Sequence, residues 1–289
     1  EREAGEALFV GSGVLWFAHR DDGFEAASEV TLRRLDVPVE RLPREEVEAR
    51  WPEISAGDLA FALHEPEAGV LRARVGVRAA VRAFERQGGT LIHARVRPGR
   101  AAAGRLAELD SDRGEHLAAG AFVFAAGPWL PRLFPDLVGG LIGITKQDVV
   151  FLGPAPGDSR FEADRFPAWI DYDAEIYGIP GLDGRGPKVP PDAYGRPFDP
   201  DATDRLVDAS SIETVRRYLA IRIPGLADRP VVETRVCQYE ATPDTHFILD
   251  RHPDLENVWL AGGGSGHAFK HGPEIGRYVV GSLDGGVPP

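Results

Sequence analysis

The chain has 289 residues, of which 43% are hydrophobic and 27% charged, a composition that predicts a packed core rather than a disordered chain. With 33 basic against 45 acidic residues the formal net charge is −12, which disfavours nucleic acid and anionic membranes as partners and favours a small molecule. No apolar run reaches the roughly 20 residues that span a bilayer, and a single cysteine excludes an internal disulfide, so we expect a cytoplasmic protein.

The first residues resemble the end of a helix that began earlier. Glu1-Arg2-Glu3 is typical of a last helical turn, and Gly5 is a residue type that often ends helices. The sequence also contains no methionine, so the initiator is absent. We therefore expect the native N-terminus to lie upstream of Glu1.

From residue 8 to residue 140 the pattern alternates between strands and helices. Short apolar runs between turn residues predict strands at residues 8–17, 58–64, 90–95 and 120–127. Helical spacing and helix-start signals predict helices at residues 21–35, 42–47, 72–86 and 128–134. A polar hairpin is expected at residues 105–117.

The rest of the chain predicts longer strands and two further helices. The strands are expected at residues 144–152, 168–180, 230–240 and 258–261, the first two in a second sheet. The helices are expected at residues 211–221 and 273–283, and residues 183–204, rich in Gly, Pro and Asp, should form a loop. Because the two element types alternate without a clean boundary, we expect two interleaved domains.

Residues 261–270, Ala-Gly-Gly-Gly-Ser-Gly-His-Ala-Phe-Lys, place glycines between a strand and a helix. This architecture brings backbone N–H groups and the positive end of a helix dipole to a negative group. The alternative is a turn that needs glycine for a positive φ. Lys270 stands near the start of the helix, where the dipole disfavours a cation, and this indicates a role other than stability.

Three further side chains in this region allow a different interpretation. His267, His271 and Glu274 are spaced i, i+4, i+7 and could bind a metal from one helical face. Pro273 argues against a helix through residues 267–271, which favours ordinary surface or packing histidines. We assign no metal site.

Other candidate side chains lie in three separate segments. In a strand, Cys237 and Tyr239 point to one face about 7 Å apart, so a thiol and a phenol could enter one pocket; the alternative for Cys237 is a buried small hydrophobe. Lys188 lies in a Gly/Pro loop, where a solvated surface charge is the alternative. Residues 125–129, Ala-Ala-Gly-Pro-Trp, end a buried strand, where backbone closely approaches either a neighbour or a cofactor.

Together these segments resemble, in the same order and over nearly the whole chain, the amine-oxidising flavoprotein family that includes monomeric sarcosine oxidase, N-methyltryptophan oxidase and, more distantly, glycine and D-amino acid oxidases. The Cys-x-Tyr and Gly-Ser-Gly-His-x-Phe-Lys segments are specific in combination. The matching pieces are Gly13-Val-Leu15, Glu67–Val70, Ala125–Trp129, Tyr177–Pro180, Lys188, Cys237–Tyr239, Thr242–Asp244, His246–Asp250 and Gly264–Lys270.

The resemblance implies a role for each matched residue. Cys237 aligns with the cysteine that carries FAD through a thioether in the sarcosine oxidase branch, and Lys188 aligns with a flavin-facing lysine associated with oxygen activation. Tyr239 and Lys270 align with groups that engage the substrate carboxylate, and these two residues and Lys188 are the implied catalytic residues. The implied FAD-binding residues are Ala126, Gly127, Trp129, Cys237, Gly263, Gly264, Ser265, Gly266, His267 and Lys270. The glycine segment would lie under the pyrimidine edge of the flavin, where N–H dipoles stabilise negative charge.

The chain departs from the family pattern at three points. The strand–Gly-x-Gly-x-x-Gly–helix unit that grips the ADP pyrophosphate in relatives is absent. Pro187 stands where relatives usually carry a bulky apolar residue. Asp192 stands where the sarcosine enzymes have a histidine near the substrate, which argues against sarcosine itself as the substrate.

The resemblance implies an α/β fold. A glutathione-reductase-like FAD-binding domain (residues 64–140 and 256–289), without its N-terminal βαβ unit, would be interleaved with an antiparallel-sheet substrate domain (residues 1–63 and 141–255). The implied reaction is oxidation of a C–N bond of an amino acid or secondary amine, with molecular oxygen as acceptor and hydrogen peroxide as product. A dehydrogenase of the same fold, a metal-dependent hydrolase and an inactive fragment or binding scaffold remain alternatives.

Overall fold

The computed structural model describes residues 5–201, 204–283 and 285–286, so the helical turn expected at Glu1 to Glu3 lies outside the described residues. The chain divides into two compact units, each assembled from separate stretches of sequence. Unit 1 comprises residues 1–78, 147–195 and 203–237; unit 2 comprises residues 79–146, 196–202 and 238–289. The elements that continue across a boundary are α3 (Ala73–Arg86), β12 (Gly143–Leu152) and β16 (Val231–Ala241).

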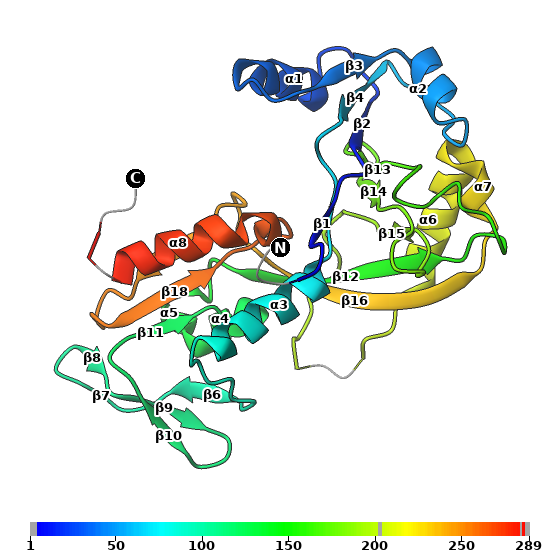
Figure 1. Cartoon of the computed structure of the whole chain (residues 1–289). Helices are drawn as coiled ribbons and strands as arrows, with labels where there is room; N and C mark the ends of the chain where they lie inside the picture. Colours follow the sequence, from blue (N-terminus) through cyan, green and yellow to red (C-terminus); the bar gives the residue numbers. More distant parts are fainter. Residues whose placement is uncertain (1–4, 202–203, 284, 287–289) are drawn as a thin grey trace. The chain divides into compact units, whose positions relative to one another are not determined.

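Unit 1 contains a five-stranded sheet in the order β14-β13-β2-β4-β3 (Figure 1). Its strands are β2 (Val14–Ala18), β3 (Glu40–Leu42), β4 (Phe61–Glu65), β13 (Ala168–Asp171) and β14 (Ile176–Gly178). β13 and β2 are parallel, and the other neighbours are antiparallel. Two smaller sheets occur as well. β1 (Phe9–Val10) pairs with β5 (Val70–Leu71), and β15 (Lys188–Val189) is the first strand of the sheet β15-β12-β16.

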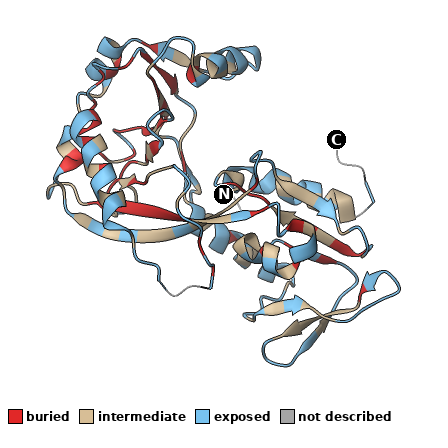
Figure 2. Ribbon diagram, turned by 180° about the vertical axis from the view of Figure 1, so that it is seen from behind, coloured by how far each residue is buried: buried red, intermediate tan, exposed pale blue. Residues whose placement is uncertain are grey.

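The helices of unit 1 are α1 (Phe24–Arg34), α2 (Arg44–Arg50), α6 (Ala209–Arg222) and α7 (Pro224–Ala227). One core cluster joins the sheet to α6, since Phe17, Trp169 and Leu219 are all at most 2% exposed (Figure 2). Burial of such large apolar side chains supplies most of the stabilisation of a fold. The ring of Tyr218 stacks on Trp169, and its hydroxyl donates to the fully buried Asp171.

Unit 2 contains the sheet β11-β18-β17, in which β11 and β18 are parallel and β17 is antiparallel to β18. These strands are β11 (Phe122–Phe124), β17 (Ile248–Arg251) and β18 (Val258–Gly262). A second sheet, β10-β9-β6, and the hairpin β7-β8 use β6 (Val96–Pro98), β7 (Ala101–Ala102), β8 (Arg105–Leu106), β9 (Glu108–Ser111) and β10 (His116–Ala118). The helices are η1 (Gly127–Trp129), α4 (Leu130–Leu133), α5 (Pro135–Val138), η2 (Ala268–His271) and α8 (Gly272–Leu283).

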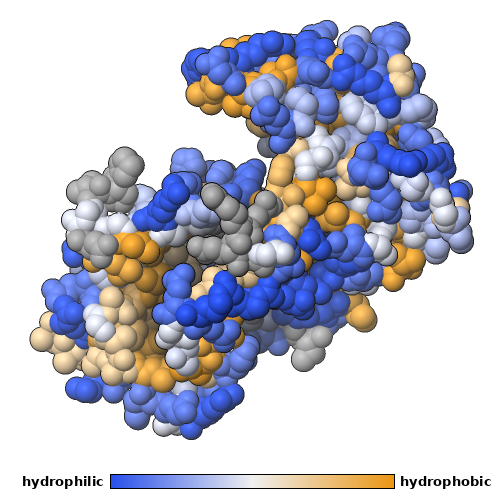
Figure 3. Space-filling view, in the orientation of Figure 1, coloured by the Kyte–Doolittle hydropathy of each residue, from blue (hydrophilic) through white to orange (hydrophobic). Residues whose placement is uncertain are grey.

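The core of unit 2 packs β11 and β18 against α4 and α5, with Phe124 and Phe134 in an edge-to-face contact of 4.7 Å between ring centres. α8 buries none of its described residues, and Val280 is 56% exposed. Hydrophobic residues are visible at the surface on the face drawn in Figure 3. Among the described residues, no helix has the length and hydropathy needed to cross a membrane.

Most predicted elements are confirmed, and two predictions were wrong. The strand predicted at residues 90–95 does not form; all six residues are described, and Leu91 and Ile92 are almost half exposed. The strand instead begins at Val96, where β9 provides a partner. Apolar side chains favour a strand only where a neighbouring strand can pair with it.

The long strand predicted at residues 168–180 is two strands, β13 and β14, joined by a tight turn. The side chain of Asp171 accepts a hydrogen bond from the amide of Ala174 at 3.1 Å, and Glu175 adopts a φ of 50°. An aspartate that bonds the backbone three residues later initiates a turn. β13 then pairs with β2 in the five-stranded sheet rather than with the sheet that contains β12.

Candidate functional site

Strand β18 leads into a segment that we call the glycine turn, Gly262 to Gly266, and this turn leads into η2 and α8. Gly263, Ser265 and Gly266 have φ values of 72°, 45° and 81°. Two of these positions carry the glycine that a left-handed backbone favours. Ser265 does not, so hydrogen bonds must offset the conformational cost of its backbone.

Strand β16 and the loop after it hold the glycine turn in place. The amide of Ser265 donates to the carbonyl of Glu240 at 3.1 Å. The hydroxyl of Ser265 accepts from the amide of Thr242 at 3.2 Å and donates to the carbonyl of Gly263 at 3.1 Å. The buried Ser265 therefore joins both sides of the turn to the strand, which accounts for its strained backbone.

The side chain of Glu240 also contacts the turn, a relationship that sequence reasoning missed. Its Oε1 accepts a hydrogen bond from the amide of Gly264 at 3.3 Å. Burial raises the pKa of this carboxyl, and hydrogen bonds from the amides of Gly264 and Gly263 oppose the rise. The signal in the sequence was an acidic residue next to Tyr239, near the end of a predicted strand.

The structure brings Tyr239 and Gly266 together. A Cβ atom added to Gly266 would lie 2.5 Å from Cε2 of Tyr239, so the phenol ring rests directly against the backbone of the turn. His267 lies with Nδ1 3.1 Å from the carbonyl oxygen of Ser265. Lys270 lies exposed in η2, the short helix that follows the turn. Tyr239 and Lys270, both predicted to engage a carboxylate, therefore belong to the elements that meet at this turn.

The histidines of this region pack against an aromatic ring. The ring of Phe247 lies 5.2 Å from that of His267 and 5.7 Å from that of His271. The two histidine rings are 6.4 Å apart and almost perpendicular, and Glu274 pairs with Arg277 at 2.9 Å. These contacts support the interpretation as packing and surface residues.

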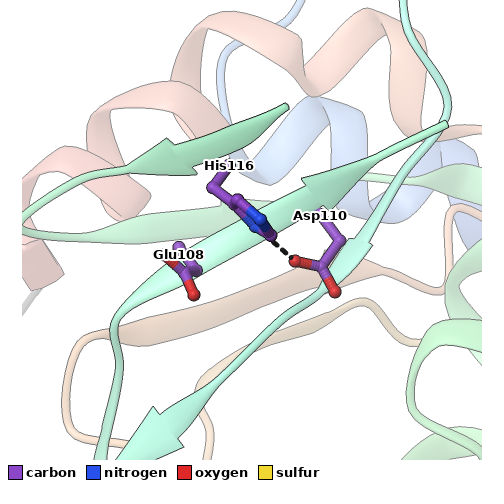
Figure 4. Close-up of side chains that lie close together, drawn as sticks. All are labelled: Glu108, Asp110 and His116. Atoms are coloured by element: carbon purple, nitrogen blue, oxygen red, sulfur yellow. Dashed lines mark hydrogen bonds and ion pairs between the residues drawn. The ribbon is translucent and has the colours of Figure 1, made fainter. Parts of the chain in front are cut away.

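One group of three potential metal ligands occurs in the part of the chain that the structure describes: Glu108 and Asp110 on β9 and His116 on β10 (Figure 4). Their ligand atoms lie within 4.8 Å of one another. His116 is hydrogen-bonded to Asp110 at 3.0 Å, while Arg100 and Arg97 lie 3.6 and 3.7 Å from the two carboxylates. These guanidinium groups compensate the negative charge that a cation would require.

Lys188 is partly buried on β15 in unit 1, so it is not the fully solvated surface charge of the alternative interpretation. Its Nζ donates to the hydroxyl of Tyr177 at 3.2 Å. Burial lowers the pKa of Lys188, and the guanidinium groups of Arg235 and Arg185 lower it further, whereas Cys237 opposes the change. The ammonium is thus held in a partly desolvated environment with a phenol as its neighbour.

Cys237 is exposed on β16, so the alternative of a buried, inert thiol does not hold. Lys188 is close enough for its pKa to respond to the charge of Cys237. Arg235, two residues away on the same strand, is engaged by Glu233 at 2.6 Å. Reactive cysteines are exposed and lie near a positive charge. For Cys237 the neighbouring cation is Lys188, because Arg235 is already paired with Glu233.

The segment Ala126 to Trp129 borders a cavity of about 840 Å³ in unit 2. The indole N–H of Trp129 donates to Asp201 at 3.0 Å, and Arg95 lies 3.3 Å from the same carboxylate. Sequence reasoning included Ala126, Gly127 and Trp129 but missed Arg95, Val96 and Asp201, because these come from two other stretches of the chain. The lining residues are Ala94, Arg95, Val96, Arg97, Asp110, Ser111, Asp112, Ala126, Trp129, Arg132, Leu133 and Asp201.

A parallel strand pair that ends in a glycine turn, in a unit with a large cavity, is an arrangement typical of α/β proteins that bind a cofactor. The family model described as FAD dependent oxidoreductase (DAO) matches residues 1–281, so the chain belongs to the DAO family of FAD-dependent oxidoreductases.

Named relatives agree with this assignment. The chain is 30% identical to a monomeric sarcosine oxidase of Streptomyces avermitilis, over 97% of this chain and 74% of the relative. It is 28% identical to the peroxisomal sarcosine oxidase of Mus musculus, over 100% of this chain and 75% of the relative. It is 27% identical to an N-methyl-L-tryptophan oxidase of Yersinia pestis, over 96% and 74%.

Solved structures show the same fold. The iminodiacetate oxidase from Chelativorans sp. BNC1 superposes with a TM-score of 0.80 at 25% identity, covering 99% of this chain and 77% of that one. The fructosyl peptide oxidase from E. terrenum superposes with a TM-score of 0.84 at 20% identity, covering 100% and 73%.

The residues of unit 2 fit FAD, the cofactor that the family name states. Within the glycine turn Gly266 is exposed, whereas Gly263, Gly264 and Ser265 are buried, so a flat group can approach the backbone only at the Gly266 end of the turn. The cavity beside Trp129 combines a predominantly apolar wall with Arg95, Arg97 and Arg132, which are paired with Asp110 and Asp201 of the same wall, so it suits a large ligand with an apolar or aromatic part.

Proposed function

We propose that this protein uses FAD to oxidise a C–N bond of an amino acid or secondary amine and passes the electrons to molecular oxygen, which gives hydrogen peroxide. The observation that carries the proposal is the contact between Tyr239 and the glycine turn, with Lys270 in the next helix. Strand β16 and the elements around the glycine turn thus bring together a surface for a flat cofactor with a hydroxyl and a cation for a substrate. The names of the relatives, sarcosine oxidase and N-methyl-L-tryptophan oxidase, are consistent with a substrate that is an N-substituted amino acid.

Lys270 and Tyr239 are proposed to bind the substrate. The exposed ammonium of Lys270 attracts the carboxylate of the substrate, and the hydroxyl of Tyr239 donates a hydrogen bond to it. Anchoring the carboxylate fixes the amine relative to the turn, which converts binding energy into orientation. The amine must be neutral to release its electrons. FAD, when bound, supplies the acceptor for the hydrogen and the electrons that leave the substrate.

Lys188 is proposed to act in the second half of the reaction. Its ammonium is partly desolvated, and an electrostatic interaction is stronger in such surroundings than in water. It would therefore stabilise the negative charge that develops as oxygen is reduced. Its hydrogen bond to Tyr177 holds the side chain in one position for this role.

Several finer assignments belong to the same proposal. We assign the FAD-binding role to residues 64–140 and 256–289 in a glutathione-reductase-like domain, and the substrate-binding role to residues 1–63 and 141–255. Cys237 is the proposed point of covalent FAD attachment, supported by its exposure and its proximity to Lys188. A cytoplasmic location is supported by the single cysteine. The segment expected upstream of Glu1 stays a prediction.

The test is spectroscopic. We expect the full-length protein to show the visible absorption of oxidised flavin, to bleach when mixed anaerobically with an N-methyl amino acid, and to release hydrogen peroxide when air is admitted. Bleaching followed by electron transfer to a dye, without peroxide, would indicate a dehydrogenase. A colourless protein that acquires no flavin from added FAD would refute the proposal.

A further inference from the structure

The carboxyl group of Glu240 lies directly beneath the first half of the glycine turn. Its Oε1 accepts the amide of Gly264 at 3.3 Å. A Cβ atom added to Gly262 would lie 3.1 Å from Oε2, and one added to Gly264 would lie 3.2 Å from Oε1. Both distances are shorter than ordinary van der Waals contacts, so the carboxyl fills the space that side chains at these two positions would need.

The other oxygen of this carboxyl is shielded from solvent. Oε2 is buried and makes no hydrogen bond to any residue that the structure describes. No salt bridge involving Glu240 occurs among the described residues either. Burial of a carboxylate oxygen that has no hydrogen-bond donor and no nearby cation favours the neutral form of the group.

The two halves of the turn are held by different parts of β16 and its following loop. Ser265 is held by the carbonyl of Glu240 and the amide of Thr242, neither of which needs the Glu240 side chain. The carboxyl of Glu240 holds the amide of Gly264, whereas Gly262 also packs against Leu130 and Gly263 packs against the loop after β16. Because Gly264 has no side chain to restrict its backbone, this hydrogen bond contributes directly to its conformation.

We propose that Glu240 is a positioning residue for the cofactor: its carboxyl holds the buried start of the glycine turn at Gly264, by shape and hydrogen bonding rather than by negative charge, and so fixes the exposed Gly266 end that would meet FAD. This inference rests on the proposed function, because it takes the glycine turn as the surface that meets FAD. It adds a residue that touches neither cofactor nor substrate and acts through the turn.

The experiment compares two variants that separate the hydrogen bond from the volume. Glu240→Gln keeps an acceptor at Oε1 and carries no charge, whereas Glu240→Met has a similar volume and no oxygen. We expect Glu240→Gln to bind FAD within about two-fold of wild type, and Glu240→Met to bind roughly ten-fold more weakly, the factor for one lost hydrogen bond. Glu115→Gln, an exposed acid in unit 2, is the matched control.

A second measurement does not depend on FAD. Hydrogen exchange of the Gly264 amide in the apoprotein should be unchanged in Glu240→Gln and faster by about ten-fold in Glu240→Met, since the amide loses its acceptor. Thermal unfolding of each variant shows whether an effect is confined to the turn. Rescue by glutamine of both exchange and FAD affinity would support the proposal.

The possible failures are distinguishable. If Glu240→Met binds FAD and exchanges its Gly264 amide as wild type does, the positioning role is refuted. If Glu240→Gln loses affinity as much as Glu240→Met, the negative charge matters and the proposal is wrong. If the wild-type protein binds no FAD but the exchange results hold, the proposed function fails while the support of the turn by Glu240 stands.

Discussion

The Nζ atom of Lys188 donates a hydrogen bond to the hydroxyl of Tyr177 across 3.2 Å, and the same ammonium lies 5.1 Å from the centre of the Tyr177 ring. The backbone helps to maintain this pairing, because the amides and carbonyls of Lys188 and Ile179 exchange hydrogen bonds of 2.8 and 2.9 Å. A phenol that both accepts a hydrogen bond and presents its ring to a cation can hold a partly desolvated ammonium in one place.

This arrangement predicts the effect of removing the charge. In the full-length protein, Lys188→Met should slow the reoxidation of reduced flavin by oxygen about 10²-fold or more, the loss expected for one preorganised electrostatic group. Reduction of the flavin by substrate should change less. Stopped-flow measurement of the two half-reactions checks the prediction. Unaltered reoxidation would show that Lys188 has no part in the oxygen reaction.

Lys270 and Tyr239 are predicted to recognise a carboxylate. Lys270→Ala should raise the dissociation constant of a carboxylate inhibitor by the equivalent of about 1.5–3 kcal/mol, the contribution of a charge-assisted hydrogen bond. Tyr239→Phe should have a smaller effect, since a neutral donor is lost. Flavin difference spectra give both constants. Equal losses for a carboxylate and for its neutral amide analogue would mean that Lys270 acts on the structure of the site instead.

Cys237 is predicted to carry the flavin covalently. A thioether bond forms from a cysteine that the flavin can reach, and Cys237 is exposed and interacts with Lys188. After acid precipitation of the full-length protein, we expect the pellet to stay yellow. Cys237→Ala should release its flavin to the supernatant. Complete release of flavin from fully loaded wild-type protein would contradict the attachment.

The contact between Gly266 and Tyr239 makes a substitution at this glycine costly. Gly266→Ala places a Cβ 2.5 Å from the phenol ring at a φ of 81°, and should lower the free energy of unfolding by roughly 1–3 kcal/mol. Gly276 in α8 has nothing within 4 Å of its Cβ position, so Gly276→Ala should instead raise it by up to about 1 kcal/mol. Urea denaturation of both variants measures the difference. Equal stabilities would show that the ring does not rest on the turn.

The raised pKa of Glu240 predicts that the free energy of unfolding depends on pH. Its pKa is raised from the usual 4.5 by burial, so the folded protein binds more protons than the unfolded chain between the unfolded and the folded value. The free energy of unfolding therefore decreases through this group as the pH rises across that interval. Glu240→Gln removes the contribution and should gain stability relative to wild type as the pH rises above about 4.5. If the free energy of unfolding depends on pH in the same way in both proteins, the pKa of Glu240 is not raised.

The sequence by itself determined those features that depend on nearby residues. Helical spacing and capping located α6, α8 and α3 to within about three residues, because a helix satisfies its backbone with neighbours four residues away. The glycine turn was predicted for a similar reason, since a positive φ at Gly263 and Gly266 is a local demand. The family resemblance rested on the same local segments and was confirmed.

Only the tertiary structure decided which distant segments meet. β13 pairs with β2, a strand about 150 residues earlier, and nothing in the apolar pattern of residues 168–180 specifies that partner. The cavity beside Trp129 depends likewise on Asp201, which lies 72 residues later. Glu240 lies 24 residues before Gly264 and looked like an ordinary acid in a strand. Its burial, and therefore its raised pKa, arises from the packing of the turn above it, since desolvation is a property of the folded surroundings rather than of the residue.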